Sequence, residues 1–352
     1  MTKSRAILTY SLGVSCFGVI GLFRTWSGLD AYGASFVRGV WGALILGLGA
    51  VIFNRSIIKV KLSYLIRCLL WGSILGIAIF FYFKTMDYSN QSIAAIFLFL
   101  QVVWYPIYTK LFLVEEAQRT RWTIYLSTQL LTIFGTFLAL GIFQLRANYK
   151  LNNYAIIFGF LVSFTAFLYF VVGRWLFFSK SKQEKEILYS IFNRISLVPI
   201  YEKLLNDEHD SQVNLPSFWI SYQRTLYQSI GMVFVCFLYI PYNNIFFNRL
   251  FQLDALMNGF FLGSICLAAA FFFITYADSI SYFESNGTRS LLSTKVKGIS
   301  QQIELILSLI VGYFLLNETI GMNGLIGCII LLTSYIVGLF FSEKELIATQ
   351  KA

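Results

Sequence analysis

Apolar stretches long enough to cross a lipid bilayer make up most of this chain and constrain its fold more than any other feature. A transmembrane helix needs about 20 predominantly apolar residues. Ten stretches meet this length, near residues 6–23, 31–53, 64–83, 91–113, 121–143, 154–178, 218–240, 254–277, 290–316 and 323–341. Polar and apolar residues do not alternate within them, as they would in the strands of a membrane barrel. The sequence therefore predicts an all-α polytopic membrane protein with ten transmembrane helices.

The composition agrees with a membrane environment. Of 352 residues, 57% are hydrophobic and 12% are charged, whereas a soluble protein carries about 25% charged residues. The chain has too few polar side chains to cover itself in water. All 5 cysteines fall in predicted spans, where a thiol behaves as a small apolar side chain. We therefore expect no disulfide, no metal site and no cofactor.

Basic residues predict the orientation in the membrane. If the N-terminus is cytoplasmic, ten spans return the C-terminus to the same side, and the cytoplasmic segments then hold 17 Lys and Arg against 5 outside. Cytoplasmic loops are enriched in these residues. We therefore expect both termini to be cytoplasmic, and the composition fits a bacterial inner membrane. Because this topology accounts for the net charge of +10, we expect no nucleic-acid partner.

Two short motifs occur twice in the chain. Residues 35–38 (Ser-Phe-Val-Arg) correspond to 221–224 (Ser-Tyr-Gln-Arg), and residues 72–76 (Gly-Ser-Ile-Leu-Gly) correspond to 259–263 (Gly-Phe-Phe-Leu-Gly). The arginine of the first motif precedes the first glycine of the second by 34 positions in one copy and by 35 in the other. Conserved spacing with drifted sequence is typical of the internal repeats of secondary transporters.

The motifs predict two repeats, residues 1–150 and 151–352, with five spans each. Glu116 and Glu318 each close a long apolar run. Since five is an odd number, the second repeat enters the membrane from the opposite side. We therefore expect inverted repeats related by a pseudo-two-fold axis in the membrane plane. Such repeats provide equivalent gates on the two sides of the membrane.

The segment 179–217 interrupts the regular succession of spans. It begins basic and ends acidic, and between these ends Leu188, Ile191, Ile195 and Val198 fall on one helical face. This pattern predicts an amphipathic helix on the cytoplasmic surface. A solvated hairpin with no partner fits the pattern equally well.

The sequence lacks the motifs that would support catalysis or ATP hydrolysis. It contains no G-x-x-x-x-G-K-[ST] phosphate loop, no H-E-x-x-H, no G-x-S-x-G and no Cys/His cluster at metal spacing. The single histidine rules out a histidine-based proton relay. We therefore expect that the protein is not an enzyme and is not driven by ATP.

Ionisable residues inside apolar helices are costly and usually mark a transport pathway. Arg38 lies near the start of predicted span two, and Arg224 lies near the start of predicted span seven. As a repeat-related pair on opposite sides of the membrane, they are candidates for gate-proximal charges. The alternative is that each side chain extends to the nearest headgroup layer.

Predicted span nine is the most polar of the ten. Lys297, Gln301, Glu304 and Ser308 are separated by four, three and four positions, so they share one helical face. Lys295 lies on an adjoining face. A polar stripe of this kind is unfavourable against lipid, so we expect it to face a cavity or another helix.

Predicted span four is the counterpart of span nine. It carries Gln101 and Tyr105 four positions apart on one face, and Pro106 can bend the helix there because it removes a backbone hydrogen bond. The predicted substrate-binding residues are the polar side chains of spans four and nine: Gln101, Tyr105, Lys295, Lys297, Gln301 and Glu304.

Glu304 is the central candidate because of its expected depth. It lies 13 residues after Leu291, which is about 20 Å along a helix and beyond the middle of a hydrocarbon core about 30 Å thick. A carboxylate at this depth must be protonated, paired with a cation or hydrated by a cavity. Lys297 or Arg38 is a possible internal partner, and a substrate amine or a coupling proton is the functional alternative.

Ten spans in two inverted halves, with a glutamate closing spans four and nine, resemble the drug/metabolite transporter superfamily, and its EamA-like branch most closely. The matching stretches are residues 80–95, 159–176 and 315–318. Members often carry a Glu-Pro pair about 14 positions before the closing glutamate, whereas here Glu304 is followed by Leu305. The resemblance implies a cavity lined by spans three, four, eight and nine.

Three functional hypotheses remain open. The first is a secondary active transporter of small polar metabolites that works by alternating access, with a proton as a candidate coupling ion. The second is an antiporter for phosphorylated or nucleotide-linked substrates, favoured by Lys295 and Lys297 because the resemblance implies a phosphate-binding lysine there. The third is a non-transporting membrane protein that binds lipid or a partner through residues 179–217. The sequence does not indicate the oligomeric state.

Overall fold

The structure is a computed structural model that describes residues 3–112, 122–139, 152–177, 216–239, 244–280 and 300–317, with further single positions within 186–193 and 326–337. Every regular element in these ranges is a helix, and no strand occurs among them. The predicted all-α class is therefore confirmed. Glu116, Glu318 and most of the 179–217 segment lie outside the described residues.

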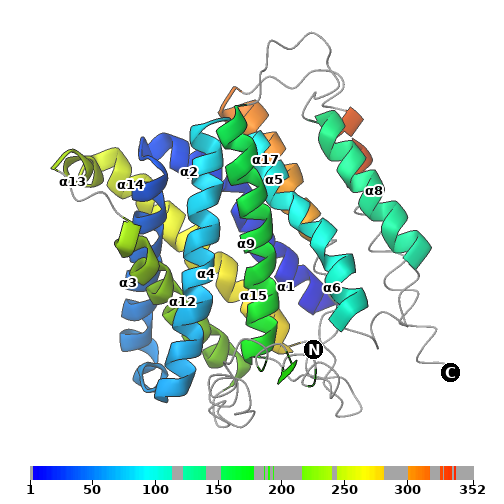
Figure 1. Cartoon of the computed structure of the whole chain (residues 1–352). Coiled ribbons are helices and arrows are strands. Elements are labelled where there is room, and N and C mark those ends of the chain that lie inside the picture. The colour runs from blue at the N-terminus through cyan, green and yellow to red at the C-terminus, as the bar shows by residue number, and fades with distance from the viewer. Residues whose placement is uncertain are drawn as a thin grey trace.

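The helices form a bundle in which α8 lies along one edge (Figure 1). In chain order the elements are α1 (Lys3–Ser15), η1 (Cys16–Val19), α2 (Ile20–Ser27), α3 (Ala31–Phe53), η2 (Arg55–Ile58), α4 (Leu62–Asp87), α5 (Gln91–Phe99), η3 (Leu100–Val103), α6 (Trp104–Phe112), α8 (Trp122–Ala139), α9 (Asn153–Phe177), α12 (Ser217–Tyr239), α13 (Asn244–Leu250), α14 (Leu253–Gly263), η4 (Ser264–Ala269), α15 (Ala270–Ile280) and α17 (Gln302–Leu315).

Five helical segments are long and apolar enough to cross a membrane. They are Arg5–Ser27, Ala31–Phe53, Leu62–Asp87, Asn153–Phe177 and Leu253–Asp278. They coincide with predicted spans one, two, three, six and eight. Large apolar side chains such as Leu48, Ile52 and Phe234 are exposed on the outside of the bundle, as expected for a surface in contact with lipid. These features indicate a membrane protein.

Packing is dominated by a few long helix pairs. α4 packs against α9 and α12, α3 packs against α12 and α14, and α15 packs against α1. The largest cluster of buried apolar residues lies among these helices and includes Leu75, Tyr82, Met232, Leu262 and Leu267. Helices far apart in the sequence therefore share this largest cluster.

Glycines allow two of these helix pairs to approach closely. A Cβ atom added at Gly72 of α4 would collide with the backbone of Gln228 on α12, and one added at Gly263 of α14 would collide with the backbone of Gly42 on α3. Small residues at such crossings let helix backbones pack directly against each other in a membrane. The two glycine motifs are thus explained by steric need.

Three of the longer helical segments are not regular α-helices. The 3-10 turn η1 divides residues 3–27, the 3-10 turn η3 divides residues 91–112, and the π-helical turn η4 divides residues 253–280. Pro106 explains η3, because proline has no N–H for the carbonyl of residue 102 and its ring would clash with that carbonyl in a continuous α-helix. The irregular turn therefore ends at Val103, three residues before Pro106, near the position where the sequence predicts a bend.

The glycine at position 72 gives a stability prediction. We expect Gly72→Ala to lower the free energy of unfolding by about 1–3 kcal/mol, because overpacking forces the two backbones apart. Gly47→Ala is the matched control, since its Cβ would meet only Leu226 Cδ1, at 4.0 Å, and alanine is the better helix former. Thermal unfolding of the detergent-purified variants measures the difference. Equal midpoints for the two variants would contradict the close-packing explanation.

Candidate functional site

A cavity of about 60 Å³ lies inside the bundle. Its lining residues come from segments 3–27 and 91–101, from α4, α9 and α15, and from the start of α17. Most of the wall is apolar, and five aromatic side chains contribute to it: Phe17, Tyr82, Tyr169, Phe170 and Phe271. Since a single water needs about 10–15 Å³ on the same measure, the cavity has room for a small solute or a few waters.

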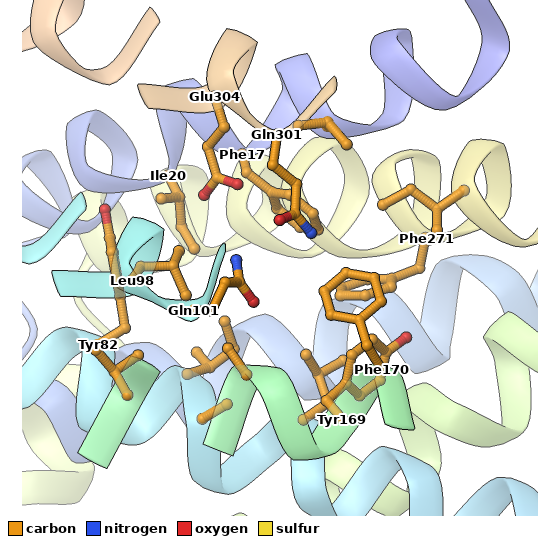
Figure 2. A pocket seen from close by; sticks show the side chains of 17 residues that line it. Phe17, Ile20, Tyr82, Leu98, Gln101, Tyr169, Phe170, Phe271, Gln301 and Glu304 are labelled. Carbon is orange, nitrogen blue, oxygen red and sulfur yellow. The ribbon is translucent and has the colours of Figure 1, made fainter. Parts of the chain in front are cut away.

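Three polar side chains converge on this cavity. Figure 2 shows Glu304, in the first turn of α17, and Gln301, the residue before that helix, pointing into it, with Gln101 of η3 directed at the same space. All three are buried, with exposed fractions of 8%, 3% and 3% in that order. An apolar pocket with a few convergent polar groups is the usual form of a small-molecule site.

Gln301 is held in place from behind. Its Nε2 donates to the hydroxyl of Tyr105, with 3.3 Å between the two atoms. Tyr105 is buried and packs edge-on against Phe167 and Phe170, and it is not among the residues that line the cavity. Tyr105 therefore positions a wall residue and does not itself face the cavity.

A second polar contact fixes α17 on its other side. Gln302 Nε2 donates to Thr132 Oγ1 of α8 at 2.8 Å, and the hydroxyls of Thr132 and Ser334 share a hydrogen bond of 2.5 Å. This network anchors the helix that carries Glu304. Gln302 thus has a structural partner on the face adjoining the polar stripe.

Arg38 lies next to the cavity but outside its lining. Its side chain is fully buried, Nη2 donates to the carbonyl of Cys266, and the guanidinium lies 5.7 Å from the ring centre of Phe17. Cys266 belongs to the π-helical turn η4, so Arg38 supplies a donor where the helix is irregular. The two remaining guanidinium nitrogens have no hydrogen-bond partner within the described part of the chain.

Arg38 and Glu304 interact electrostatically, yet among the described residues they form no ion pair within 4 Å. The guanidinium is directed to the Cys266 carbonyl, whereas the carboxylate faces the cavity. Of the two internal partners expected for Glu304, Arg38 is therefore nearby without contacting it. Lys297, the other, lies outside the described residues, as does Lys295.

Arg224 belongs to a different environment. Its Nε donates to the Tyr64 hydroxyl at 3.3 Å, and its guanidinium lies 4.9 Å from the ring centre of Phe177. None of these residues lines the cavity. Both arginines are buried against protein groups, so neither extends to a headgroup layer through an exposed side chain.

The structure thus brings together Gln101, Gln301 and Glu304, with Tyr105 behind them. The aromatic wall residues from spans one and six, such as Phe17 and Tyr169, were missed, because the resemblance implied spans three, four, eight and nine alone. In a chain with 18% aromatic residues, no local signal separates a wall ring from a packing ring.

Comparisons with known proteins address the fold. No family model matches the sequence, and no curated protein matches it. Among solved structures 14 chains are similar. One of them, described only as "Crystal structure of protein", has a TM-score of 0.59 at 12% identity, over 97% of this chain and 99% of its own. A likeness at this identity shows a shared fold and carries no information on function.

The electrostatic interaction of Arg38 and Glu304 gives a second prediction. Arg38→Met removes the donor to the Cys266 carbonyl and leaves a buried carboxylate with less compensation, so we expect a loss of about 2–5 kcal/mol in unfolding free energy. Adding Glu304→Gln should recover part of this loss, with a coupling of about 0.5–3 kcal/mol. Denaturation of the single and double variants measures the coupling, and strictly additive losses would show that the two groups are independent.

Proposed function

We propose that this chain is a secondary active transporter of small polar metabolites, which works by alternating access and does not use ATP. The observation that carries this proposal is the apolar cavity, with a carboxylate and two amides converging on it, inside a helical membrane protein. Polar groups inside a membrane helix bundle are costly and usually serve a pathway. The drug/metabolite transporter superfamily, in its EamA-like branch, is the family we propose.

The proposal includes ten spans in two inverted halves, with both termini cytoplasmic and a bacterial inner membrane as the location. Helix packing supports the inverted halves. The packing of α4 on α12 corresponds to the packing of α14 on α3. In the same way, the packing of α9 on α4 corresponds to the packing of α1 and α2 on the segment 253–280. Under a two-fold relation, each of these contacts is the copy of the other.

The glycine crossings support the same relation and define its register. Gly72 meets Gln228, which lies four positions after Arg224, and Gly263 meets Gly42, which lies four positions after Arg38. These contacts favour Gly72 and Gly263 as equivalent positions of the two repeats. The motifs suggest instead that Gly72 is equivalent to Gly259, which lies one helical turn before Gly263.

The two arginines also have related surroundings. Arg38 meets the segment 253–280 and the ring of Phe17 in the first segment, while Arg224 meets α4 and the ring of Phe177 in α9. Arg38 lies near the start of α3, whereas Gln223, the residue before Arg224, donates to the Ile57 carbonyl just beyond the end of α3. This arrangement fits gate-proximal charges on opposite sides of the membrane.

An ion pair joins two segments at one end of the bundle. Arg24 of α2 pairs with Asp87, the last residue of α4, and Lys84 Nζ lies 3.6 Å from the same carboxylate. Asp87 lies 15 positions after Gly72, and Asp278 lies 15 positions after Gly263. This correspondence supports a gate at each end, closed in this conformation at the end that carries Asp87.

Arginines at matching positions extend the correspondence. Arg24 lies three residues before the end of α2, and Arg174 lies three residues before the end of α9. If the halves are inverted, Arg174 at the cytoplasmic end is equivalent to Arg24 at the outer end. Asp278 is then equivalent to Asp87 in the same way. Alternating access requires such a duplicated device.

The phosphate-exchange hypothesis depends on Lys295 and Lys297, which lie outside the described residues. The described cavity is too small for a nucleotide in this conformation. The hypothesis of a non-transporting protein is separated from transport by measuring solute flux in liposomes.

Solute transport by the Glu304→Gln variant tests the proposed function. The variant is reconstituted into liposomes, and uptake of metabolite fractions separated by charge is compared with the native protein across a pH series. The same vesicles are assayed for solute counterflow without a gradient. Loss of gradient-driven uptake with counterflow retained would assign proton coupling to Glu304, and loss of both would assign substrate binding. Native behaviour in both assays would remove Glu304 from the mechanism, and absence of flux by the native protein would contradict transport.

The ion pair gives a prediction about access. A reporter cysteine at Ala78, which lines the cavity, is introduced after the native cysteines are replaced, and a membrane-impermeant maleimide is added from outside. Arg24→Asp places like charges together, so we expect labelling to rise several-fold, and Arg24→Asp with Asp87→Arg should restore low labelling. Unchanged labelling in the single variant would show that the pair does not close the cavity.

A further inference from the structure

We propose that Arg38 is a positioning residue that couples the charge of Glu304 to the backbone geometry of the π-helical turn η4. This inference rests on the proposed function and concerns the regulation of the same site. The turn η4 joins α14 to α15, and α15 supplies Phe271 and Ile274 to the wall of the cavity. A change in η4 therefore changes the shape of the candidate site.

The π-turn leaves one carbonyl without its α-helical partner. In a regular α-helix the N–H of Ala270 would donate to the carbonyl of Cys266, four residues earlier. Here it donates to the carbonyls of Ile265 and Leu267. The Cys266 carbonyl instead accepts a hydrogen bond from Arg38 Nη2. Arg38 thus takes the place of a main-chain donor, and its bond stabilises the π-turn relative to the regular helix.

The guanidinium of Arg38 has donors that this bond does not use. Nε and Nη1 are buried and have no hydrogen-bond partner within the described part of the chain. A buried charge with unused donors costs free energy, so a second acceptor nearby competes with the Cys266 carbonyl. Glu304 is such an acceptor, since it interacts electrostatically with Arg38 and among the described residues forms no ion pair with it within 4 Å.

The 3-10 turn η1 connects the surroundings of the two charges. Phe17 of η1 lies beside the guanidinium, with its ring centre 5.7 Å away, and η1 packs against both η4 and α17. A Cβ added at Gly18 would collide with Leu307 and would lie 3.5 Å from the main-chain oxygen of Glu304. The two charges and the irregular turn therefore belong to one continuous region of contact.

Glu304 is the group whose charge can change the attraction on Arg38. The other titratable groups that interact with these two residues or with Cys266 are thiols and phenols, which are ordinarily neutral near pH 7. They come from the surrounding elements and are Cys16, Cys236, Cys266, Tyr82, Tyr105 and Tyr169. A further carboxylate, that of Asp278, interacts with Tyr10 and Tyr169.

These contacts define two arrangements. When a proton or a bound cation neutralises Glu304, Arg38 stays on the Cys266 carbonyl and η4 keeps its π-turn. When Glu304 is ionised, it attracts Arg38, and the Ala270 N–H can then donate to the Cys266 carbonyl in a regular turn. Because a π-turn holds more residues than an α-turn, this change turns α15 about its axis and moves its cavity-lining side chains. A ligand shifts such an equilibrium through its different affinities for the two arrangements.

The distance between spin labels on α14 and α15 measures this rotation. Cysteines for labelling are introduced at Met257, which is exposed, and at Phe273, which is half-buried, after the native cysteines are replaced. Neither position lines the cavity. The full-length protein is reconstituted into lipid nanodiscs, and double electron–electron resonance gives the distance across a pH series. We expect the main distance to shift by several ångströms as the pH rises, with the π-turn arrangement at acidic pH, because protonation neutralises Glu304.

Variants assign the shift to the two charges. Glu304→Gln should keep the acidic distance at every pH, and Arg38→Met should abolish the pH dependence, since each removes one member of the pair. Arg38→Lys keeps a positive charge and a donor, so we expect it to retain a shift of the same sign, which a residue that only packs would not require. Glu186→Gln, at an exposed position, is the matched control and should behave as the native protein.

The opposite results overturn the inference. They are a distance that does not change with pH in the native protein, or an unchanged pH dependence in Glu304→Gln or in Arg38→Met. If Arg38→Met does not fold, Glu304→Gln decides, and Arg38→Lys must retain the shift. Liposome flux separates these outcomes from failure of the proposed function: a pH-dependent distance without flux contradicts transport alone, and flux with a pH-independent distance contradicts coupling through Arg38 alone.

Discussion

Backbone hydrogen bonding in a medium without water is the constraint on which the rest of this structure depends. A helix that crosses a bilayer must satisfy its N–H and C=O groups internally, so irregular turns are tolerated only where protein groups or a cavity provide partners. The three irregular turns η1, η3 and η4 occur in segments that line the cavity. Arg38 donates to a carbonyl of η4, so a buried charge maintains an irregular backbone next to the candidate site. Gln101 lies in a different kind of irregular turn, the 3-10 turn η3.

Much of the fold was predictable because membrane insertion imposes a simple rule on the sequence. The lengths of the apolar stretches alone predicted helices over 31–53 and 154–178, and the structure has them at Ala31–Phe53 and Asn153–Phe177. The polar stripe through Gln301 and Glu304 was predictable because polar residues avoid lipid. In contrast, the partner of Arg38 could not be predicted, because it is a main-chain carbonyl of a π-helical turn and leaves no side-chain signal in the sequence.

The candidate site was predictable only in its polar part. Gln101, Gln301 and Glu304 stand out because polar residues are rare in their surroundings, whereas Phe17 and Tyr169 resemble dozens of other aromatic residues in the chain. The glycine motifs were visible as a repeated pattern, but their register was not, since glycines four positions apart give two pairings that differ by one turn. In the inverted repeats that we propose, the backbone contacts of Gly72 and Gly263 favour one of these pairings, and the sequence alone does not show which glycine meets the opposing helix.

The threonines on the inner face of α8 have a mechanical consequence. Thr128, Thr132 and Thr136 follow each other at one-turn intervals, and each hydroxyl donates to the carbonyl four residues earlier. Each hydroxyl oxygen keeps the capacity to accept a further bond, as Thr132 does from Gln302. A displacement of α17 along α8 by the length of four residues, about 6 Å, would exchange one acceptor for an equivalent one. The inner face of α8 thus offers α17 the same kind of polar acceptor at three successive turns, of which Thr132 is the one that Gln302 uses.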